Sequence, residues 1–287
     1  MTMSNSFIKA AALGVLVVGL SVTGCSSAAP AAAPSTNCTP AHAGLTTVTG
    51  GTLTVAAPEF APFVTFGTDG AASGIDSEIV KAIADMECLK TDFTKVEYSA
   101  AVPAVQSGRA DVAVGDYYRT TSRAEIVGLS DPMYYDGMGI ISKDGVSDLP
   151  TIFTRKVGTV DGYLWVPDLK KVLGDSLKIY KSNVEMWADL KAGRIEVGID
   201  SIPVGELHAK DNPGWQVATA QPDDRIGASV KPAQAGLPYT KENAALGTAL
   251  NEDIAKLRSS GKLAEIFTKY NVDPKESQVT DNYLLES

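Results

Sequence analysis

An internal repeat constrains the fold of this chain more than any other feature of its sequence. Residues 107–116, SGRADVAVGD, recur as residues 192–201, AGRIEVGIDS. In both copies a helix is expected to end at the glycine, which tolerates a left-handed cap, and a short β-branched strand follows. A matching strand also precedes each copy, at residues 52–56 and 156–160. Strands that alternate with helices in this order predict βαβ units and parallel-type sheets.

Apolar periodicity predicts helices that flank these sheets. Apolar residues recur at spacings of three and four through residues 75–86 and again through residues 246–257, before Gly261. A last helix is expected over residues 263–270. We therefore predict an α/β protein of two lobes, each a mostly parallel sheet flanked by helices.

The ends of the predicted strands carry acidic and aromatic side chains. In α/β sheets, ligands bind outside the carboxyl ends of the strands, where the connections diverge. Two loops from each predicted lobe meet that description, and they can face one another across a cleft that closes on a ligand. The candidate residues in these loops are Glu59, Phe60, Asp116, Tyr117, Tyr118, Asp161, Gly162, Tyr163, Asp200 and Ser201.

The N-terminus predicts export and attachment of a lipid. Lys9 precedes an apolar run, Ala10 to Leu20, that is too short to remain as a membrane-spanning helix. The run leads to VTGC at residues 22–25, which resembles a bacterial lipobox. We expect a signal peptide at residues 1–24 and a diacylglycerol lipid, with palmitate as a fatty acid, on Cys25. An ordinary secretory signal with an accidental cysteine is the alternative.

The segment after the predicted lipid should act as a tether. Residues 25–50 are rich in Ala, Pro, Ser and Thr, which bury too little apolar surface to offset the entropy of ordering. The protein would then lie outside the cytoplasm, held on the bacterial cell membrane. Cys38 and Cys88 would share an oxidising compartment in which disulfides persist, and we predict that they pair. Two separate buried thiols are the alternative.

Composition argues against several other functions. The formal net charge is −9 and the acidic residues are dispersed, whereas a nucleic-acid-binding surface needs clustered Lys and Arg. The two histidines, His42 and His208, do not support a catalytic triad or a His-based metal cluster. No glycine-rich phosphate loop opens a helix. We therefore expect no nucleic acid, no metal, no cofactor and no enzymatic activity.

Four segments resemble a known family when taken together. They are GIDSEI at residues 74–79, VPAVQSGRADV at residues 102–112, residues 120–134, and residues 261–270. The chain resembles the polar-amino-acid-binding proteins of ABC transporters, which are bacterial extracellular solute-binding proteins of family 3 with the type II periplasmic-binding fold. The resemblance implies a monomer that captures an amino acid or related amine and delivers it to an ABC permease and its ATPase.

The resemblance also implies roles for single residues. Arg123 aligns with the arginine that binds the ligand carboxylate, and its guanidinium can donate two parallel hydrogen bonds. Phe60 and Tyr98 align with the rings that enclose the aliphatic part of the ligand. Where relatives hold the ligand ammonium with an aspartate, this chain has Ser201, and Asp200 stands one residue earlier. Because side chains alternate along a strand, Asp200 can serve only if the strand end twists or bulges.

Other acids could replace Asp200 in that role. Glu59, Asp116 and Asp161 are the candidates, and together the four carboxylates would face a single arginine. A buried carboxylate without a cation is costly, so we expect a zwitterionic or cationic ligand. Cation–π contacts could come from Tyr117, Tyr118, Tyr163 and Trp165. A ligand-sensing lipoprotein and a dehydratase-like enzyme on the same fold stay as alternatives.

The repeat and the resemblance together predict how the chain divides. We expect lobe 1 to comprise residues 51–134 and 231–287, and lobe 2 to comprise residues 138–226. The two crossings between the lobes are expected at residues 134–137 and at about residues 226–230, where hinge motion would occur.

Overall fold

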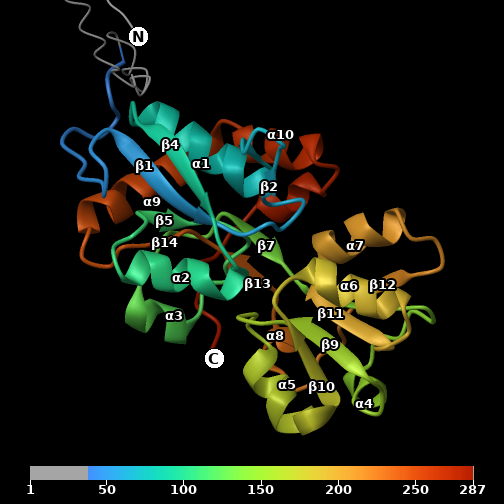
Figure 1. Ribbon diagram of the computed structural model, residues 1–287. Coiled ribbons are helices and arrows are strands. Elements are labelled where there is room, and N and C mark those ends of the chain that lie inside the picture. Colours follow the sequence, from blue (N-terminus) through green and yellow to red (C-terminus); the bar gives the residue numbers. More distant parts are fainter. Residues whose placement is uncertain (1–37, 287) are drawn as a thin grey trace, which may run out of the picture. The chain divides into compact units, whose positions relative to one another are not determined.

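The structure is a computed structural model, and it describes residues 38–286 (Figure 1). The predicted signal peptide and the predicted lipid attachment at Cys25 lie outside the described residues. Between residues 38 and 286, no helix has both the length and the apolar character that a membrane span requires.

The first sheet has five strands in the order β4-β1-β5-β14-β6. Strand β1 (Thr52–Ala57) pairs in parallel with β4 (Lys90–Lys95) on one side and β5 (Val112–Ala113) on the other. Strands β14 (Pro238–Tyr239) and β6 (Gly128–Leu129) extend the sheet in the antiparallel sense. The predicted strand at residues 52–56 is therefore an interior strand of this sheet.

Helices from both ends of the described chain flank the first sheet (Figure 1). They are α1 (Ile75–Met86), α2 (Tyr98–Gln106), α3 (Thr121–Ile126), α9 (Ala244–Ser259) and α10 (Lys262–Lys269). The apolar stripes predicted over residues 75–86, 246–257 and 263–270 lie in α1, α9 and α10. Their apolar side chains are largely buried, because α1 packs against β4 and against both α9 and α10.

The second sheet also has five strands, in the order β10-β9-β11-β8-β12. Strand β9 (Val157–Val160) pairs in parallel with β10 (Leu177–Tyr180) and with β11 (Val197–Ser201). Strands β8 (Met138–Ser142) and β12 (Gln216–Thr219) run antiparallel to their neighbours. The predicted parallel units thus form one side of a mixed sheet.

The remaining elements are short. The second sheet is accompanied by α4 (Leu149–Ile152), α5 (Val166–Leu173), the 3-10 helix η1 (Gly174–Ser176), α6 (Asn183–Lys191), α7 (Ile202–Lys210) and α8 (Gly227–Val230). Two further elements accompany the first sheet. One is a hairpin of β2 (Thr65–Phe66) and β3 (Ala72–Ser73), in which β3 contacts α1, and the other is the 3-10 helix η2 (Pro274–Ser277), which contacts α10.

The internal repeat predicts the same local structure twice, and this prediction is confirmed. Helices α2 and α6 each end just before a glycine, Gly108 and Gly193, and both glycines have φ of +68°. Strands β5 and β11 then follow. Because a left-handed residue is far less costly for glycine than for other residues, the Gly-Arg pair can redirect the chain from helix to strand in both copies.

Two connections join the sheets, and they lie side by side. The chain leaves β6 through β7 (Tyr134–Asp136) to reach β8, and it returns from β12 through β13 (Ala233–Ala235) to reach β14. Strands β7 and β13 pair antiparallel, with Asp136 opposite Ala233 and Tyr134 opposite Ala235. Strands β7 and β13 thus form a two-stranded ribbon that belongs to neither five-stranded sheet, and both connections between the sheets run through it.

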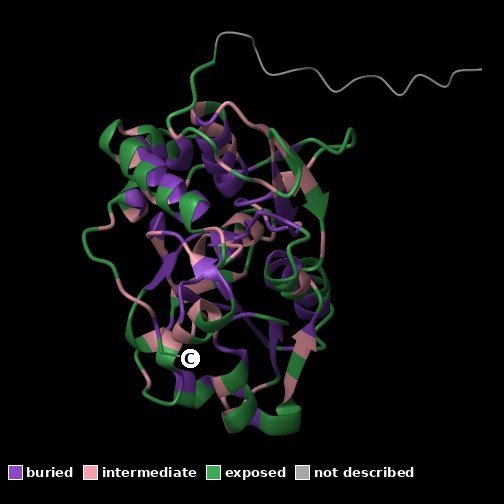
Figure 2. Ribbon diagram, turned by 90° about the vertical axis from the view of Figure 1, so that its left-hand side faces the viewer, coloured by how far each residue is buried: buried purple, intermediate pink, exposed green. Residues whose placement is uncertain are grey.

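The core extends through both sheets. Figure 2 shows buried residues on the strands and the inner faces of the helices, and exposed residues on the outer helical faces and loops. A separate, smaller cluster of apolar residues lies in the second sheet region, around Met186, Trp187 and Leu190 of α6. Both sheets are thus covered on a buried face, as α/β architecture requires.

The described start of the chain is attached to the first sheet region. Cys38 and Cys88 form the predicted disulfide. The Ala41 amide donates a hydrogen bond to the Met86 carbonyl at 3.0 Å, and the Val48 amide donates to Asp111 Oδ1 at 2.7 Å. The part of the expected tether from residue 38 to residue 50 therefore has fixed partners, because the disulfide and these bonds offset its small apolar burial.

Candidate functional site

A buried carboxylate shapes the loop that follows β5. Asp76, in the first turn of α1, accepts hydrogen bonds through Oδ2 from the amides of Gly115 (2.9 Å) and Asp116 (2.8 Å). Its Oδ1 accepts a bond from the Tyr134 hydroxyl at 2.7 Å. Asp116 adopts a left-handed backbone with φ of +57°, which is uncommon outside glycine. Asp76 therefore stabilises a tight turn that leaves the Asp116 side chain buried, with 2% of the residue exposed.

A small pocket lies where the strand ends of the two sheets meet. It is lined by Phe60, Tyr98, Asp116, Tyr118, Tyr163, Leu164, Trp165 and Ser201. Its volume, about 10 Å³, is room for roughly one water molecule. A solute as large as an amino acid can therefore enter only when the lining rings or the two sheet regions move apart.

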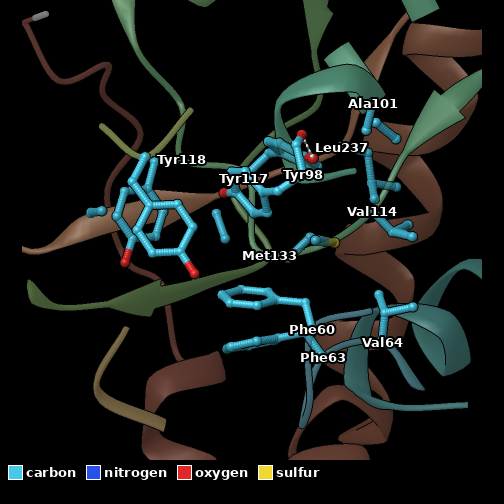
Figure 3. Packing of buried hydrophobic residues seen from close by; sticks show 14 of the residues in the cluster. Phe60, Phe63, Val64, Tyr98, Ala101, Val114, Tyr117, Tyr118, Met133 and Leu237 are labelled. Atoms are coloured by element: carbon cyan, nitrogen blue, oxygen red, sulfur yellow. Dashed lines mark hydrogen bonds between the residues drawn. The ribbon is translucent and has the colours of Figure 1, made fainter. Parts of the chain in front are cut away.

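Aromatic rings from both sheet regions close this pocket. The centroid of Phe60 lies 5.4 Å from that of Tyr98 and 5.9 Å from that of Tyr163, while Tyr98 and Tyr163 are 4.8 Å apart. Trp165 lies 5.3 Å from Tyr163 and 6.1 Å from Tyr118. Figure 3 shows Phe60, Tyr98 and Tyr118 with the neighbouring core residues. Edge-to-face walls of this kind accommodate aliphatic groups and can attract a cation to a ring face.

A wider groove continues outward from the same rings. It has a volume of about 650 Å³, and Phe60, Tyr98 and Tyr163 line both the groove and the small pocket. Glu59 belongs to the groove, where it forms an ion pair with Lys95 at 2.8 Å. Glu59 therefore has a cationic partner already, unlike the acids further in.

Asp200 and Ser201 occupy the end of β11. Asp200 Oδ1 accepts hydrogen bonds from the Tyr163 hydroxyl and from the Ser201 amide, both at 2.9 Å. Asp200 Oδ2 and Ser201 Oγ are buried without a hydrogen-bond partner among the described residues. Of these two residues only Ser201 lines the small pocket, as the alternation of side chains along a strand predicts, and Asp200 contacts the pocket wall through Tyr163.

Burial gives the acids around this site unusual protonation behaviour. Loss of hydration raises the pKa of Asp200 to about 8 and raises that of Asp76 above its ordinary value. The pKa of Asp116 is raised well above the ordinary value by burial and, next in size, by the nearby carboxylate of Asp136. At neutral pH and without a cation, protons are therefore expected on part of this cluster.

Tyrosine hydroxyls accompany the buried acids. Tyr118 donates to Asp136 Oδ2 at 2.6 Å, and Tyr163 donates to Asp200. Burial, reinforced by these carboxylates, raises the pKa of both Tyr118 and Tyr163 well above the ordinary value of 10.0. The phenols thus stay protonated and act as hydrogen-bond donors to the acids.

No cationic side chain among the described residues is bonded to the acid cluster. No hydrogen bond or ion pair within residues 38–286 joins a Lys or Arg side chain to Asp76, Asp116, Asp136 or Asp200. Asp116 Oδ1 is also buried and lacks a partner in this part of the chain. A ligand with positive charge would supply the missing counter-charge and occupy unpartnered oxygens, which is the chemistry this arrangement supports best.

Arg123 connects the two sides of the site through backbone carbonyls. Its Nη1 donates to the Tyr118 carbonyl at 2.7 Å and its Nη2 donates to the Gly162 carbonyl at 3.0 Å. The guanidinium also lies over the Tyr117 ring, 5.4 Å from its centroid. Thr120 caps α3 by accepting a bond from the Arg123 amide at 3.1 Å, which fixes the start of the helix that carries the arginine.

Gly162 lies against the first sheet region at close range. Its φ is +84°, and a Cβ at this position would lie 3.2 Å from the Ser99 Cα. A larger residue would press on α2 and would also strain the backbone. Glycine therefore permits the close approach that brings the Gly162 carbonyl within reach of Arg123.

The structure brings together seven of the residues that the sequence proposes for the site. Phe60, Tyr98, Asp116, Tyr118, Tyr163, Trp165 and Ser201 line one pocket. Tyr117 lies in the core, where its hydroxyl donates to the Tyr98 carbonyl at 2.6 Å, and Asp161 is exposed. Sequence reasoning misses Asp136, Leu164 and the positioning role of Asp76. Asp76 belongs to the GIDSEI segment, whose resemblance to the family could have indicated a role for this residue. Asp136 belongs to a segment that the sequence analysis interprets only as a hinge.

Residues 53–273 match the family of bacterial extracellular solute-binding proteins, family 3. A probable histidine-binding protein of Neisseria gonorrhoeae is 28% identical over 226 residues, which cover 74% of this chain and 80% of that protein. The histidine-binding periplasmic protein of Escherichia coli strain K12 is 24% identical over 232 residues, which cover 74% of this chain and 84% of that protein.

Solved structures show the same architecture. An ancestral arginine-binding protein bound to arginine superposes with a TM-score of 0.69 at 27% identity, over 77% of this chain and 98% of that chain. An amino acid ABC transporter substrate-binding protein from Streptococcus pneumoniae bound to L-arginine gives a TM-score of 0.70 at 26% identity, over 80% and 97% of the two chains. The expected two-lobed type II periplasmic-binding fold is confirmed by these neighbours.

The match extends over most of the chain and includes both sheets and the loops that line the small pocket. The relatives and structural neighbours reported above are named as binding proteins, in agreement with the expectation that the chain is not an enzyme. The protein therefore belongs to the bacterial extracellular solute-binding proteins of family 3.

Proposed function

We propose that this protein captures a small zwitterionic or cationic amino acid outside the cytoplasm and delivers it to an ABC permease and its ATPase. Relatives named for histidine and arginine binding support a basic amino acid as the first choice. The lipid on Cys25, predicted from the VTGC segment, would hold the protein at the cell membrane.

One observation carries the choice of ligand charge. The pocket wall presents Asp116, and Asp200 and Asp136 lie directly behind the tyrosines that complete it. None of these three acids has a Lys or Arg partner within the described chain. An anionic ligand would add charge to this cluster, whereas an ammonium or guanidinium would compensate it.

The capture mechanism that we propose is closure of two lobes. Lobe 1 would comprise residues 51–134 and 231–287 and lobe 2 residues 138–226, with hinge motion at residues 134–137 and near residues 226–230. The pairing of β7 with β13 favours a second hinge that extends into β13. A ligand stabilises the closed form only by the affinity it has for that form over the open one.

Arg123 would take part in both forms of the site. Its guanidinium donates hydrogen bonds to the backbone carbonyls of Tyr118 and Gly162, which come from different lobes in this proposal. We propose that the guanidinium turns part of its donor set toward the ligand carboxylate when a ligand is present. A guanidinium has five N–H donors, so it can keep a carbonyl partner while it binds a carboxylate.

A thermal-shift screen tests the ligand class. The protein would be unfolded in denaturant, dialysed and refolded to remove any ligand that copurifies, and then heated with basic, neutral and acidic amino acids and with simple amines. We expect basic amino acids to raise the melting temperature, because a ligand that binds only the folded state stabilises it. Stabilisation by dicarboxylic amino acids alone would refute the charge argument.

The anchor needs a separate test. Cells that express the protein would be labelled with a palmitate analogue, and Cys25→Ser would serve as the matched variant. The proposal predicts label on the wild-type protein and loss of label in the variant. Equal labelling of both, or no labelling of either, would exclude a lipid on Cys25.

A further inference from the structure

A second cluster of ionisable side chains lies at the start of the described chain, away from the ligand pocket. It consists of His42, Glu87 at the end of α1, and Asp253 in α9. One ligand atom from each residue, a ring nitrogen or a carboxylate oxygen, lies within 4.8 Å of the others. The Cys38–Cys88 disulfide joins the same two chain segments, so the positions of His42 and Glu87 are coupled by a covalent link.

The two acids of this cluster are deeply buried. Glu87 is 4% exposed and Asp253 is 1% exposed, and Asp253 Oδ2 has no hydrogen-bond partner within the described chain. The ion pair to Glu87 comes from His42, and no Lys or Arg side chain in residues 38–286 pairs with either acid. One imidazole thus faces two buried carboxylates, which leaves the cluster short of positive charge whenever both are ionised.

The surroundings orient the potential ligand atoms. Glu252 Oε2 lies 3.0 Å from His42 Nε2, on the outer side of the ring, and can accept its proton. The His42 amide donates to Glu87 Oε2 at 3.0 Å. His42 Nδ1 and Glu87 Oε1 then face each other at 2.6 Å, in the same cluster as Asp253. A carboxylate on the remote ring nitrogen is the outer-shell arrangement that fixes the tautomer of metal-binding histidines.

We propose that His42, Glu87 and Asp253 form a binding site for a divalent first-row transition-metal ion such as Zn²⁺. One imidazole and two carboxylates are a ligand set that such ions accept, with solvent completing the coordination on the side where His42 is partly exposed. The ion would supply the charge that the two buried acids lack. It would also bind the first described residues to α1 and α9, next to the disulfide.

The geometry requires a small outward movement on binding. His42 Nδ1 and Glu87 Oε1 are 2.6 Å apart, whereas two ligands at about 2.1 Å on a tetrahedral ion are about 3.4 Å apart. The present distance suits a hydrogen bond in which a proton occupies the place of the ion. The competing interpretation is therefore a purely structural His42–Glu87 ion pair. Titration with zinc distinguishes that ion pair from a metal site.

The proposal departs from the expectation that the two histidines support no metal site. That expectation rests on the small number of histidines and on the absence of cysteine pairs with zinc spacing. A site with one histidine and two acids from distant segments has no local sequence signature. Along the chain, Glu87 follows His42 by 87 − 42 = 45 residues, and Asp253 follows Glu87 by 253 − 87 = 166 residues.

Direct metal titration tests the site. Untagged protein would be treated with a chelator, dialysed against metal-free buffer, and titrated with ZnCl₂ by calorimetry, with bound zinc counted by elemental mass spectrometry. We expect one zinc ion per chain and a weakening of at least tenfold in D253N and in E87Q, since loss of an outer-shell partner alone typically costs about 10–100-fold. H208Q, which removes the other histidine of the chain, is the matched control and should bind as the wild type does.

Several results would overturn the proposal. They are absence of stoichiometric zinc on the wild-type protein, equal affinity in D253N and the wild type, or loss of binding in H208Q instead. D253N is nearly isosteric, so circular dichroism and thermal unfolding will show whether it remains folded. If E87Q does not fold, D253N and H42Q carry the test, because each removes one ligand atom at a different element. MgCl₂ binding of equal strength would also exclude a transition-metal site.

Discussion

Replacement of Asp200 by asparagine should make the protein more stable at neutral pH, although it removes a group from the functional site. Asp200 is fully buried, and only Oδ1 has donors, namely the Tyr163 hydroxyl and the Ser201 amide. An asparagine oxygen can accept both bonds. The variant therefore keeps the hydrogen bonds that the structure shows and loses the ionisable group.

The magnitude follows from the pKa of Asp200. Burial raises that pKa from 3.8 to about 8, so between these two values the folded protein holds a proton that the unfolded chain releases. The unfolded state is favoured as pH rises through this window, by about 1.4 kcal/mol per pH unit. At pH 7 the span is 7 − 3.8 = 3.2 units, or about 4 kcal/mol, and D200N removes this contribution. The gain should become small near pH 4, where Asp200 is protonated in the folded state and already partly protonated in the unfolded chain.

Urea unfolding of ligand-free protein measures this effect. The free energy of unfolding of the wild type and of D200N would be compared at pH 4, 5.5 and 7 by far-UV circular dichroism. We expect the difference to grow with pH by about 1.4 kcal/mol per unit. D175N, which removes an equal charge from an exposed site on η1, is the matched control and should leave the pH dependence of the wild type unchanged.

Two results would refute this reasoning. A stability difference between D200N and the wild type that stays constant from pH 4 to pH 7 would show that Asp200 does not hold its proton in the folded state. A variant that is less stable than the wild type at pH 7 would show that the carboxylate is already compensated without a ligand. If D200N is more stable but binds the ligand more weakly, the buried acid is a stability cost retained for binding.

Three further sets of variants test separate parts of the structure. Arg123→Ala should weaken ligand binding by roughly 2–5 kcal/mol with little change in circular dichroism, and Arg123→Lys should not restore the affinity. If calorimetry shows that Arg123→Ala binds ligand as tightly as the wild type, Arg123 is not part of the site. Gly162→Ala should lower ligand affinity about tenfold because a Cβ would meet Ser99. Gly193→Ala imposes similar backbone strain but has open space around it, so it should leave ligand affinity unchanged. Equal effects of the two variants on affinity would contradict this prediction. Replacing both Cys38 and Cys88 by serine should lower the free energy of unfolding, measured in urea, by roughly 2–4 kcal/mol, because the disulfide closes a loop with a sequence separation of 50. An unchanged free energy of unfolding would show that the disulfide does not restrict the unfolded chain.

Much of the fold could be predicted because its signals are local or repeated. The apolar period of residues 75–86 specifies α1 without any knowledge of its neighbours. The repeated Gly-Arg segments specify two helix ends and the strands that follow, with Gly108 and Gly193 in the same left-handed conformation. The antiparallel strands β8 and β12 carry no such signal, because the direction of a strand depends on how the chain crosses between sheets.

The site could be predicted only in part, because its properties arise from contacts between distant residues. Loop position identified Asp116, but the left-handed turn that buries it depends on hydrogen bonds that the Gly115 and Asp116 amides donate to Asp76, 40 residues before Asp116. The low exposure of Asp136 depends on Tyr118 and on the pairing of β7 with β13. Periodicity correctly separated Ser201 from Asp200, since the two side chains leave β11 on opposite sides.

The segment before β1 shows the same limit. Its composition predicts a tether up to residue 50, and composition describes only what a segment can bury by itself. From Cys38 onward, partners elsewhere in the chain hold the segment, among them Met86, Asp111 and Glu87. Partners supplied by tertiary structure cannot be read from the composition of the segment that they bind.

The charge of the ligand is the central claim, and calorimetry on refolded, ligand-free protein tests it most directly. L-Arginine, L-histidine and L-glutamate would each be titrated at pH 7.5 into the wild type and into D116N, which neutralises the acid that lines the pocket. The account predicts one binding site for at least one of the two basic amino acids, weaker binding to D116N, and no binding of glutamate. Binding of glutamate alone, or binding of a basic amino acid that D116N leaves unchanged, would contradict it.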